Sequence, residues 1–280
     1  MRHSFFCISI FSCLVIMSCG KGSSGTTVVT PVNPPTPGVE RPYELVWSDE
    51  FNTGTMPDTA KWAYDVGGNG WGNNELQYYT NTRQENARIA NGNLIIEARK
   101  ESYSGKNYTS ARLLTKGKAQ WTYGKFEIRA KIPKGRGTWP AIWTLSANNP
   151  LLWPDDGELD IMEEVGFTPN VIYGTAHNKL YNGANGKQKG GNKLIPDAQD
   201  SFHVYTMEWT SSQILWSIDN DTYFAYGNPG NGTDSWPYVK DFFMILNLAI
   251  GGNWGGIQGV DDSIFPQSML VDYVRVYQKK

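Results

Sequence analysis

The chain has 280 residues, of which 40% are apolar, so it is long enough to bury a sizeable core. Its 25 basic and 27 acidic residues leave a net charge of −2, which argues against a nucleic-acid partner. Its three cysteines are too few, and too clustered near the start, for a disulfide framework.

Residues 1–18 have the features of a secretory signal. Residues 5–17 are mostly apolar, but the run is shorter than the roughly 20 residues that a membrane-spanning helix needs. The run ends in Ile-Met-Ser-Cys-Gly, which resembles a bacterial lipobox, so we expect cleavage before Cys19 and a lipid on Cys19. Ordinary secretion with an incidental cysteine is the alternative.

Cleavage would leave a mature chain with a net charge of −3, because Arg2 is the only charged residue removed. Residues 19–38 are rich in Gly, Ser, Thr and Pro and are interpreted as a linker. Residues 39–280 then form one domain, expected to be monomeric. It would be held at the bacterial cell envelope and would contact the membrane through the lipid alone.

The pattern of this domain is strand-like nearly throughout. Apolar and polar residues alternate over 94–98 and 126–132, as in strands with one buried face. Residues 214–218 precede an Asp-Asn-Asp turn and a second short strand, which indicates a hairpin. Residues 242–250 are nearly all apolar, and 271–278 form a closing strand. Many short strands with Gly- and Pro-rich connections predict an all-β, antiparallel sandwich.

The segment 153–166, WPDDGELDIMEEVG, places four carboxylates in a stretch that otherwise looks like a buried strand. Carboxylates are rarely buried unless they are paired or do chemistry. Side chains alternate on a strand, so Glu158 and Asp160 share a face, and a regular strand would add Glu164 to that face. Glu164 would then lie about 20 Å from Glu158 along the strand, too far for two side chains to meet.

A β-bulge at Ile161–Met162 changes this count, because it adds one residue and restores the phase. Glu163 then shares the face of Glu158 at about 13 Å along the strand. Leaning side chains close that gap to about 5 Å, the separation of the two carboxyl groups in retaining glycosidases. We therefore predict a bulged strand on which Glu158 and Glu163 face one cleft.

In this geometry Glu158 is the nucleophile, and Asp160 holds it by a hydrogen bond. Glu163 is the general acid and then the base, with its pKa raised by the neighbouring negative charges. Two alternatives remain, an exposed acidic edge strand and a set of hard oxygen ligands for a metal. The first explains the charges but not the apolar alternates or the nearby tryptophans. The second is weaker, because histidine partners are few and the carboxylates suit a sugar site without a metal.

At this point the chain resembles glycoside hydrolase family 16, and within it the laminarinase-like β-glucanases. The segment GELDIMEEVG (157–166) is similar to the bulged active-site strand of that family. Further similar segments follow in the family's order; they are GWGNNELQYYT (70–80), SARLLTKGKAQWTYGKFEIRAKIPKGRGTWPAIWTL (110–145), YGTAH (173–177), FHVYTMEWT (202–210), NLAIGGNWGG (247–256) and VDYVRVYQ (271–278).

The resemblance implies a β-jelly roll with a substrate groove on its concave sheet and a retaining mechanism that needs no cofactor. It implies the same catalytic roles for Glu158, Asp160 and Glu163, with His177 near the acid/base. The groove residues that it implies are Asn73, Arg112, Trp139, Trp143, Trp153 and Trp254. We expect Trp47, Trp62, Trp209 and Trp216 to lie in the core, and His203 to make a structural hydrogen bond.

Many members of the family also bind one structural calcium ion on the convex side. The positions that match are Glu50, the carbonyl of Gly92 and Asp272, whose oxygens suit calcium. Alternatively, Glu50 and Asp272 only cap strand ends.

The function that these patterns favour is endo-hydrolysis of β-1,3 or mixed-linkage β-1,3/1,4 glucans. A second hypothesis is a glucan-binding protein on the same fold, although both catalytic glutamates are present. A third is a transglycosylase, since a sugar can replace water in the second step of a retaining mechanism.

Overall fold

The computed structural model describes residues 42–280, which fold into two sheets that are antiparallel except for one parallel pair of strands at the edge of the larger sheet. The signal, Cys19 and the linker lie outside these described residues. The larger sheet has ten strands. In the order of the sheet they are β15 (Asp221–Gly227), β14 (Gln213–Ile218), β13 (His203–Trp209), β8 (Gly124–Lys131), β17 (Gln267–Lys279), β5 (Asn93–Tyr103), β6 (Lys106–Ser110) and β3 (Gln77–Tyr79), with β1 (Tyr43–Asp49) beside β17 and β4 (Ala87–Ala90) beside β5.

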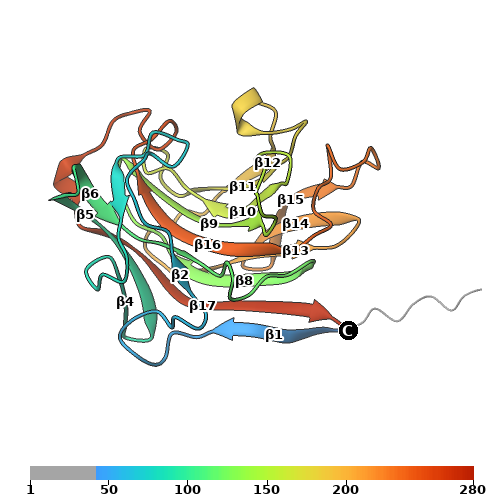
Figure 1. Cartoon of the computed structure of the whole chain (residues 1–280), viewed down its shortest axis with the longest axis horizontal. Helices are drawn as coiled ribbons and strands as arrows, with labels where there is room; N and C mark the ends of the chain where they lie inside the picture. Colours follow the sequence, from blue (N-terminus) through green and yellow to red (C-terminus); the bar gives the residue numbers. More distant parts are fainter. Residues whose placement is uncertain (1–41) are drawn as a thin grey trace, which may run out of the picture. The chain divides into compact units, whose positions relative to one another are not determined.

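The smaller sheet has seven strands, and its middle strands carry the candidate site. In the order of the sheet they are β12 (Lys189–Leu194), β11 (Val171–His177), β10 (Glu158–Glu163), β9 (Thr138–Ser146), β16 (Phe242–Ile250), β7 (Arg112–Leu114) and β2 (Ala63–Tyr64). Figure 1 shows β16 and β9 curving over β8 and β17 of the other sheet. The prediction of an all-β sandwich is confirmed.

The helical content of the described part is limited to two short 3₁₀ turns, η1 (Gly183–Asn185) and η2 (Asp262–Ile264). No helix within residues 42–280 has the length and apolar character needed to cross a membrane.

The main core fills the space between the two sheets, and β16 shows how the sequence builds it. Its even-numbered residues from Phe242 to Ile250 join the large buried cluster. Its odd-numbered residues face the other way: Phe243 and Ile245 form a small second cluster, and Asn247 lines the groove. Both faces of β16 are therefore covered, which explains the nearly unbroken apolar run.

Three of the four expected core tryptophans, Trp62, Trp209 and Trp216, are fully buried, and Trp47 packs against the same cluster from a partly buried position. His203 contacts Asp219 through Nδ1 at 2.6 Å, a structural contact as expected.

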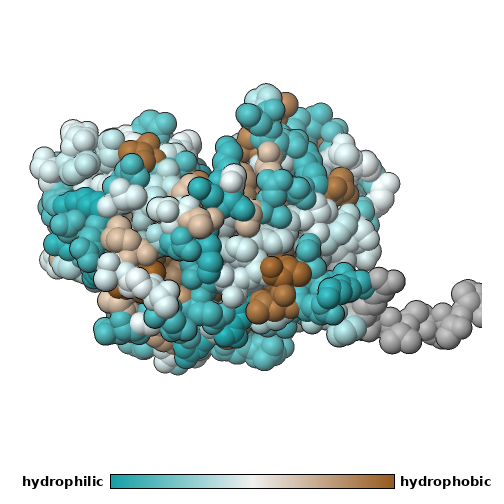
Figure 2. All heavy atoms as spheres, turned by 60° about the horizontal axis from the view of Figure 1, so that its bottom comes forward, coloured by the Kyte–Doolittle hydropathy of each residue, from teal (hydrophilic) through white to brown (hydrophobic). Residues whose placement is uncertain are grey.

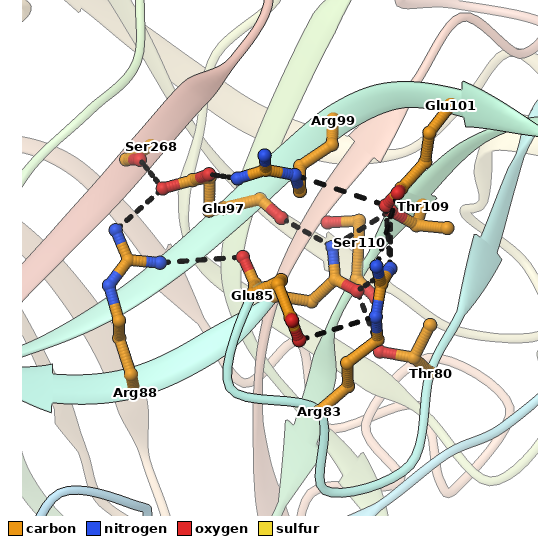
Figure 3. A network of polar contacts seen from close by, with 11 residues as sticks. Thr80, Arg83, Glu85, Arg88, Glu97, Arg99, Glu101, Thr109, Ser110 and Ser268 are labelled. Carbon is orange, nitrogen blue, oxygen red and sulfur yellow. Dashed lines mark hydrogen bonds and ion pairs between the residues drawn. The ribbon is translucent and has the colours of Figure 1, made fainter.

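A network of charged and polar groups ties the 80–88 segment to β5 and β6 (Figure 3). Arg83 binds the carboxylate of Glu101 through both terminal nitrogens, at 2.5 and 3.1 Å. Glu97 accepts from Arg88 at 2.6 Å and also pairs with Arg99. Bidentate pairs of this kind hold their geometry better than single surface ion pairs, so this network fixes the loop that follows β3.

The face that Figure 2 brings forward is mainly polar, with small apolar patches. Among the exposed large apolar side chains are Leu45 and Val46 of β1. Isolated exposed apolar groups of this kind are normal on a protein surface.

Candidate active site

The three predicted catalytic carboxylates line one open pocket on the seven-stranded sheet. Its lining residues are Trp71, Asn73, Glu75, Arg112, Trp139, Ala141, Trp143, Glu158, Asp160, Glu163, Asn247 and Ala249. Aromatic rings and polar groups around a concave surface are typical of a ligand site.

The predicted bulge is present in β10. The register shifts between Asp160 and Met162 against β9, and between Asp160 and Glu163 against β11. Ile161 and Met162 both turn into the core, so Glu163 returns to the face of Glu158. Glu164 is fully buried away from the pocket, as the bulged geometry requires.

Glu158 lies between an indole and an imidazole. Trp153 Nε1 donates to Glu158 Oε2 at 2.9 Å, and His177 Nε2 lies 3.8 Å from Glu158 Oε1. Burial and then the charge of Asp160 raise the pKa of Glu158 to about 8, while His177 and the indole act in the opposite direction. The two contacts therefore limit the rise in the pKa of Glu158 but do not reverse it.

Glu163 has fewer groups that favour its charged form. Trp139 Nε1 donates to Glu163 Oε1 at 3.0 Å. Burial, followed by the charge of Asp160, raises the pKa of Glu163 well above its ordinary value. The shift has the predicted direction, although burial contributes more than the neighbouring charges. A carboxyl that keeps its proton suits a general acid.

One predicted contact, the hydrogen bond from Asp160 to Glu158, differs from the structure. Asp160 Oδ2 lies 3.1 Å from His177 Nε2 and has no hydrogen-bond partner within residues 42–280, so this oxygen faces His177 rather than Glu158. His177 is therefore beside the nucleophile and Asp160, and it also lies near enough to the acid/base Glu163 to lower the pKa of that carboxyl. The reason is strand register, because His177 is directly opposite Glu158 in the pairing of β10 with β11.

Ligand-type atoms of Glu158, Asp160 and His177 all lie within 4.8 Å of one another, which raises the question of a metal ion. His177 Nδ1 accepts a hydrogen bond from the backbone N–H of Gly183 at 3.0 Å. The proton of a neutral ring is then on Nε2, the atom that faces the carboxylates, so no lone pair is available there for a metal. The donor set does not fit a metal ion in this arrangement.

The floor of the pocket is a hydrogen-bonded chain that the sequence analysis did not identify. Trp143 Nε1 donates to Asn247 Oδ1 at 2.7 Å, and Asn247 Nδ2 donates to the hydroxyl of Tyr79 at 3.0 Å. Tyr79 in turn donates to Glu75 at 3.2 Å. A single polar residue inside the apolar run of β16 was the available signal for Asn247, and Glu75 lies two residues after the predicted Asn73.

Arg112 forms the side of the pocket next to this floor. Its guanidinium lies between the rings of Trp71 and Trp143, 4.9 and 4.7 Å from their centroids, and its Nε is 2.9 Å from Asp65 Oδ2. Arg112 and Asn73 thus both reach the pocket, as predicted, and Trp71 is a further aromatic residue there.

Trp254 lies at the Trp139 end of the pocket. Its ring is edge-on to Trp139, with centroids 5.6 Å apart, and to Tyr173 at 5.0 Å. Trp254, a predicted groove residue, is not among the residues that line this pocket.

The predicted calcium ligands have other partners. Glu50 accepts from Arg275 Nε and Nη2 at 3.0 and 2.8 Å, and Asp272 accepts from Arg129 at 2.5 Å. As they stand, these carboxylates do not fit a calcium site, because each is neutralised by an arginine. Calcium binding there stays a prediction, and it would require both carboxylates to exchange an arginine for the ion.

Comparison with known proteins agrees with this geometry. The sequence profile of glycosyl hydrolases family 16 matches residues 74–275. The chain belongs to this family. A β-glucanase from Rhodothermus marinus is 55% identical over 244 residues, which cover 84% of this chain and 85% of that protein.

Solved structures of the family are also similar to this one. The laminarinase of Rhodothermus marinus superposes with a TM-score of 0.84 over 86% of this chain and 99% of its own, at 55% identity. A non-specific endo-β-1,3(4)-glucanase superposes with a TM-score of 0.82 at 47% identity, over 86% and 94% of the two chains. This family 16 chain is a glycoside hydrolase of the endo-β-glucanase type.

Proposed function

We propose that this enzyme cuts internal β-1,3 bonds of laminarin-type glucans, or the bonds of mixed-linkage β-1,3/1,4 glucans, with retention of configuration. The observation that carries the proposal is the bulge of β10, which turns Glu158 and Glu163 to the same pocket while Glu164 is buried elsewhere. The family members compared above act on glucans of these types by their names.

In the first step the Glu158 carboxylate attacks the anomeric carbon as Glu163 gives its proton to the glycosidic oxygen. The bond between carbon and oxygen breaks, and the sugar is left as an ester of Glu158. Glu163, now ionised, then takes a proton from a water molecule that attacks the same carbon, and Glu158 leaves as a carboxylate.

The tryptophans act before this chemistry. The indole N–H of Trp153 and that of Trp139 hold the two carboxylates in their rotamers. Trp143 and Trp71, packed on either side of Arg112, offer rigid aromatic surfaces for sugar rings. A positioned nucleophile and acid lower the entropic part of the barrier.

A panel of laminarin, barley β-glucan, lichenan, agarose and carrageenan tests the substrate class. We expect new reducing ends from the first three and an early fall in viscosity, the mark of internal cleavage. Activity on agarose and carrageenan alone would contradict the proposal. Products longer than the substrate at high oligosaccharide concentration would favour the transglycosylase alternative.

Glu158→Gln tests whether the protein is a catalyst or only a binder. We expect a loss on the order of a thousandfold or more, with glucan binding retained. Glu164→Gln is the matched control, because it changes a neighbouring buried glutamate that does not face the pocket. Equal reducing-end release by wild type and Glu158→Gln would overturn the assignment.

We also propose that the enzyme is a lipid-anchored monomer of the bacterial cell envelope. The support is the sequence around Cys19 and the Pro-rich segment that follows it. Incorporation of a labelled fatty acid into wild type but not into Cys19→Ala would support the anchor. Full labelling of Cys19→Ala would contradict it.

A further inference from the structure

The ring of His177 is held from two opposite sides. On one side Nε2 lies 3.1 Å from Asp160 Oδ2 and 3.8 Å from Glu158 Oε1. On the other side Nδ1 accepts the backbone N–H of Gly183 at 3.0 Å. A backbone amide can only donate, so this contact requires a lone pair on Nδ1.

The turn that carries Gly183 is ordered by its own hydrogen bonds. Asn182 caps η1: its side chain accepts from the backbone N–H of Asn185, and the side chain of Asn185 accepts from the backbone N–H of Asn182. The amide of Asn182 also donates to the carbonyls of Asn178 and Lys179, at 3.0 and 3.2 Å. The Gly183 N–H is therefore placed by a built turn, not by a free loop.

The charges around the ring oppose this arrangement. The carboxylates that face His177 are those of Asp160, Glu158 and Glu163, and they raise its pKa to about 9 against the effect of burial. Two uncharged side chains also contact His177: the Trp153 ring lies 6.3 Å from the imidazole between centroids, and the Tyr238 hydroxyl donates to the backbone carbonyl of His177. The carboxylates thus favour an imidazolium, whose second N–H would point at the N–H of Gly183.

We propose that the Gly183 N–H is a positioning group that keeps His177 neutral, with its single proton on Nε2 as a donor to Asp160. The negative charge of Asp160 is then not compensated by an imidazolium, and it helps Glu163 to hold the proton that it delivers. The inference rests on the proposed roles of Glu163 and Asp160. It adds the backbone group that sets the protonation state of His177, the residue beside them.

The direct test is ¹⁵N NMR of the full-length protein labelled at histidine, at pH 7, without substrate. The His177 signals are assigned by their loss in His177→Gln. We expect an unprotonated Nδ1 and a protonated Nε2. A ring protonated on both nitrogens, or protonated on Nδ1 alone, would overturn the proposal. This measurement does not depend on glucan activity, so it is separate from a failure of the proposed function.

A pair of variants at Gly183 tests the cause. Gly183→Pro removes the N–H at the first position of η1, where the helical backbone accepts proline, but its ring Cδ replaces that hydrogen and so also displaces the His177 ring. Gly183→Ala keeps the N–H, and its Cβ would lie 3.4 Å from His177 Cε1, an ordinary contact. Both variants are first checked for wild-type far-UV circular dichroism and a cooperative unfolding transition.

In Gly183→Pro we expect His177 to become doubly protonated at pH 7. The alkaline limb of kcat/KM should then move to lower pH, because a nearby cation favours ionised Glu163. Gly183→Ala should keep the wild-type NMR signals and the wild-type pH profile. A Gly183→Pro enzyme that folds and still holds neutral His177 with the proton on Nε2 would contradict the role of Gly183, and a Gly183→Ala enzyme that behaves like Gly183→Pro would do the same.

Discussion

Trp216 donates its indole N–H to the backbone carbonyl of Asp160 at 2.8 Å. The bond runs from β14 of the larger sheet to the start of the bulge in the smaller one. Trp216 is fully buried, so this carbonyl has a partner where water is excluded. A core residue of one sheet thereby fixes the backbone shape that the chemistry on the other sheet requires.

We expect Trp216→Phe to lower kcat by about tenfold, because the bulge loses the bond that holds it and Glu163 is less well placed. The free energy of unfolding should fall by about 1–3 kcal/mol for the carbonyl left unpaired. Steady-state kinetics and urea unfolding measure the two effects.

Trp209→Phe is the matched control for this variant. Trp209 is equally buried in the larger sheet, and its indole donates to the carbonyl of Tyr238 at 3.1 Å. It should lose similar stability but keep kcat. If both variants lose activity in proportion to stability, Trp216 has no particular role at the bulge.

The pH profile tests the part that Asp160 plays. Its charge is the second cause, after burial, of the raised pKa of both Glu158 and Glu163. In Asp160→Asn both pKa values should fall, so both limbs of kcat/KM should move to lower pH by about one unit. Asp200→Asn removes an equal charge at an exposed pair with Lys134 and should leave the profile unchanged. Unmoved limbs in Asp160→Asn would contradict the electrostatic account.

The buried side chain of Glu164 should make the free energy of unfolding depend on pH. Burial raises its pKa to about 7 in the folded protein, from an ordinary value of 4.5, against hydrogen bonds from Asn170 and Gln199. The folded state therefore prefers the protonated form, and stability is lost as the pH rises through about 7. Urea unfolding of Glu164→Gln should match wild type near pH 5 but exceed it by up to about 3 kcal/mol near pH 8.5. An equal difference at both pH values would show that Glu164 does not titrate in this range.

The bulge could be predicted because reach and side-chain phase leave only one way for two glutamates of this strand to meet. The larger strands followed from local alternation, as in β8 and β14. The partner of His177 could not be predicted in this way, since it depends on the register of β11 against β10. The residues of the pocket floor come from three distant segments, so the chain order does not reveal that they meet.

The same dependence on tertiary packing explains why the predicted calcium ligands have arginine partners that the sequence did not reveal. A sequence places Glu50 and Asp272 near strand ends, but it does not show which cations face them. Arg275 belongs to the strand that also carries Asp272, and its side chain reaches Glu50 on the neighbouring segment. Long basic side chains compete with ions for such carboxylates, and only the packed sheet decides which partner is close.

The most direct test of the account is azide rescue of Glu163→Ala on an activated β-glucoside of laminari-oligosaccharide, with the product's anomeric configuration read by NMR. If Glu158 is the nucleophile, azide attacks the glycosyl ester from the face that Glu163 vacated, and the product is the β-glycosyl azide. An α-glycosyl azide would assign the nucleophile to Glu163 and contradict the central claim, and so would an activity that azide does not restore.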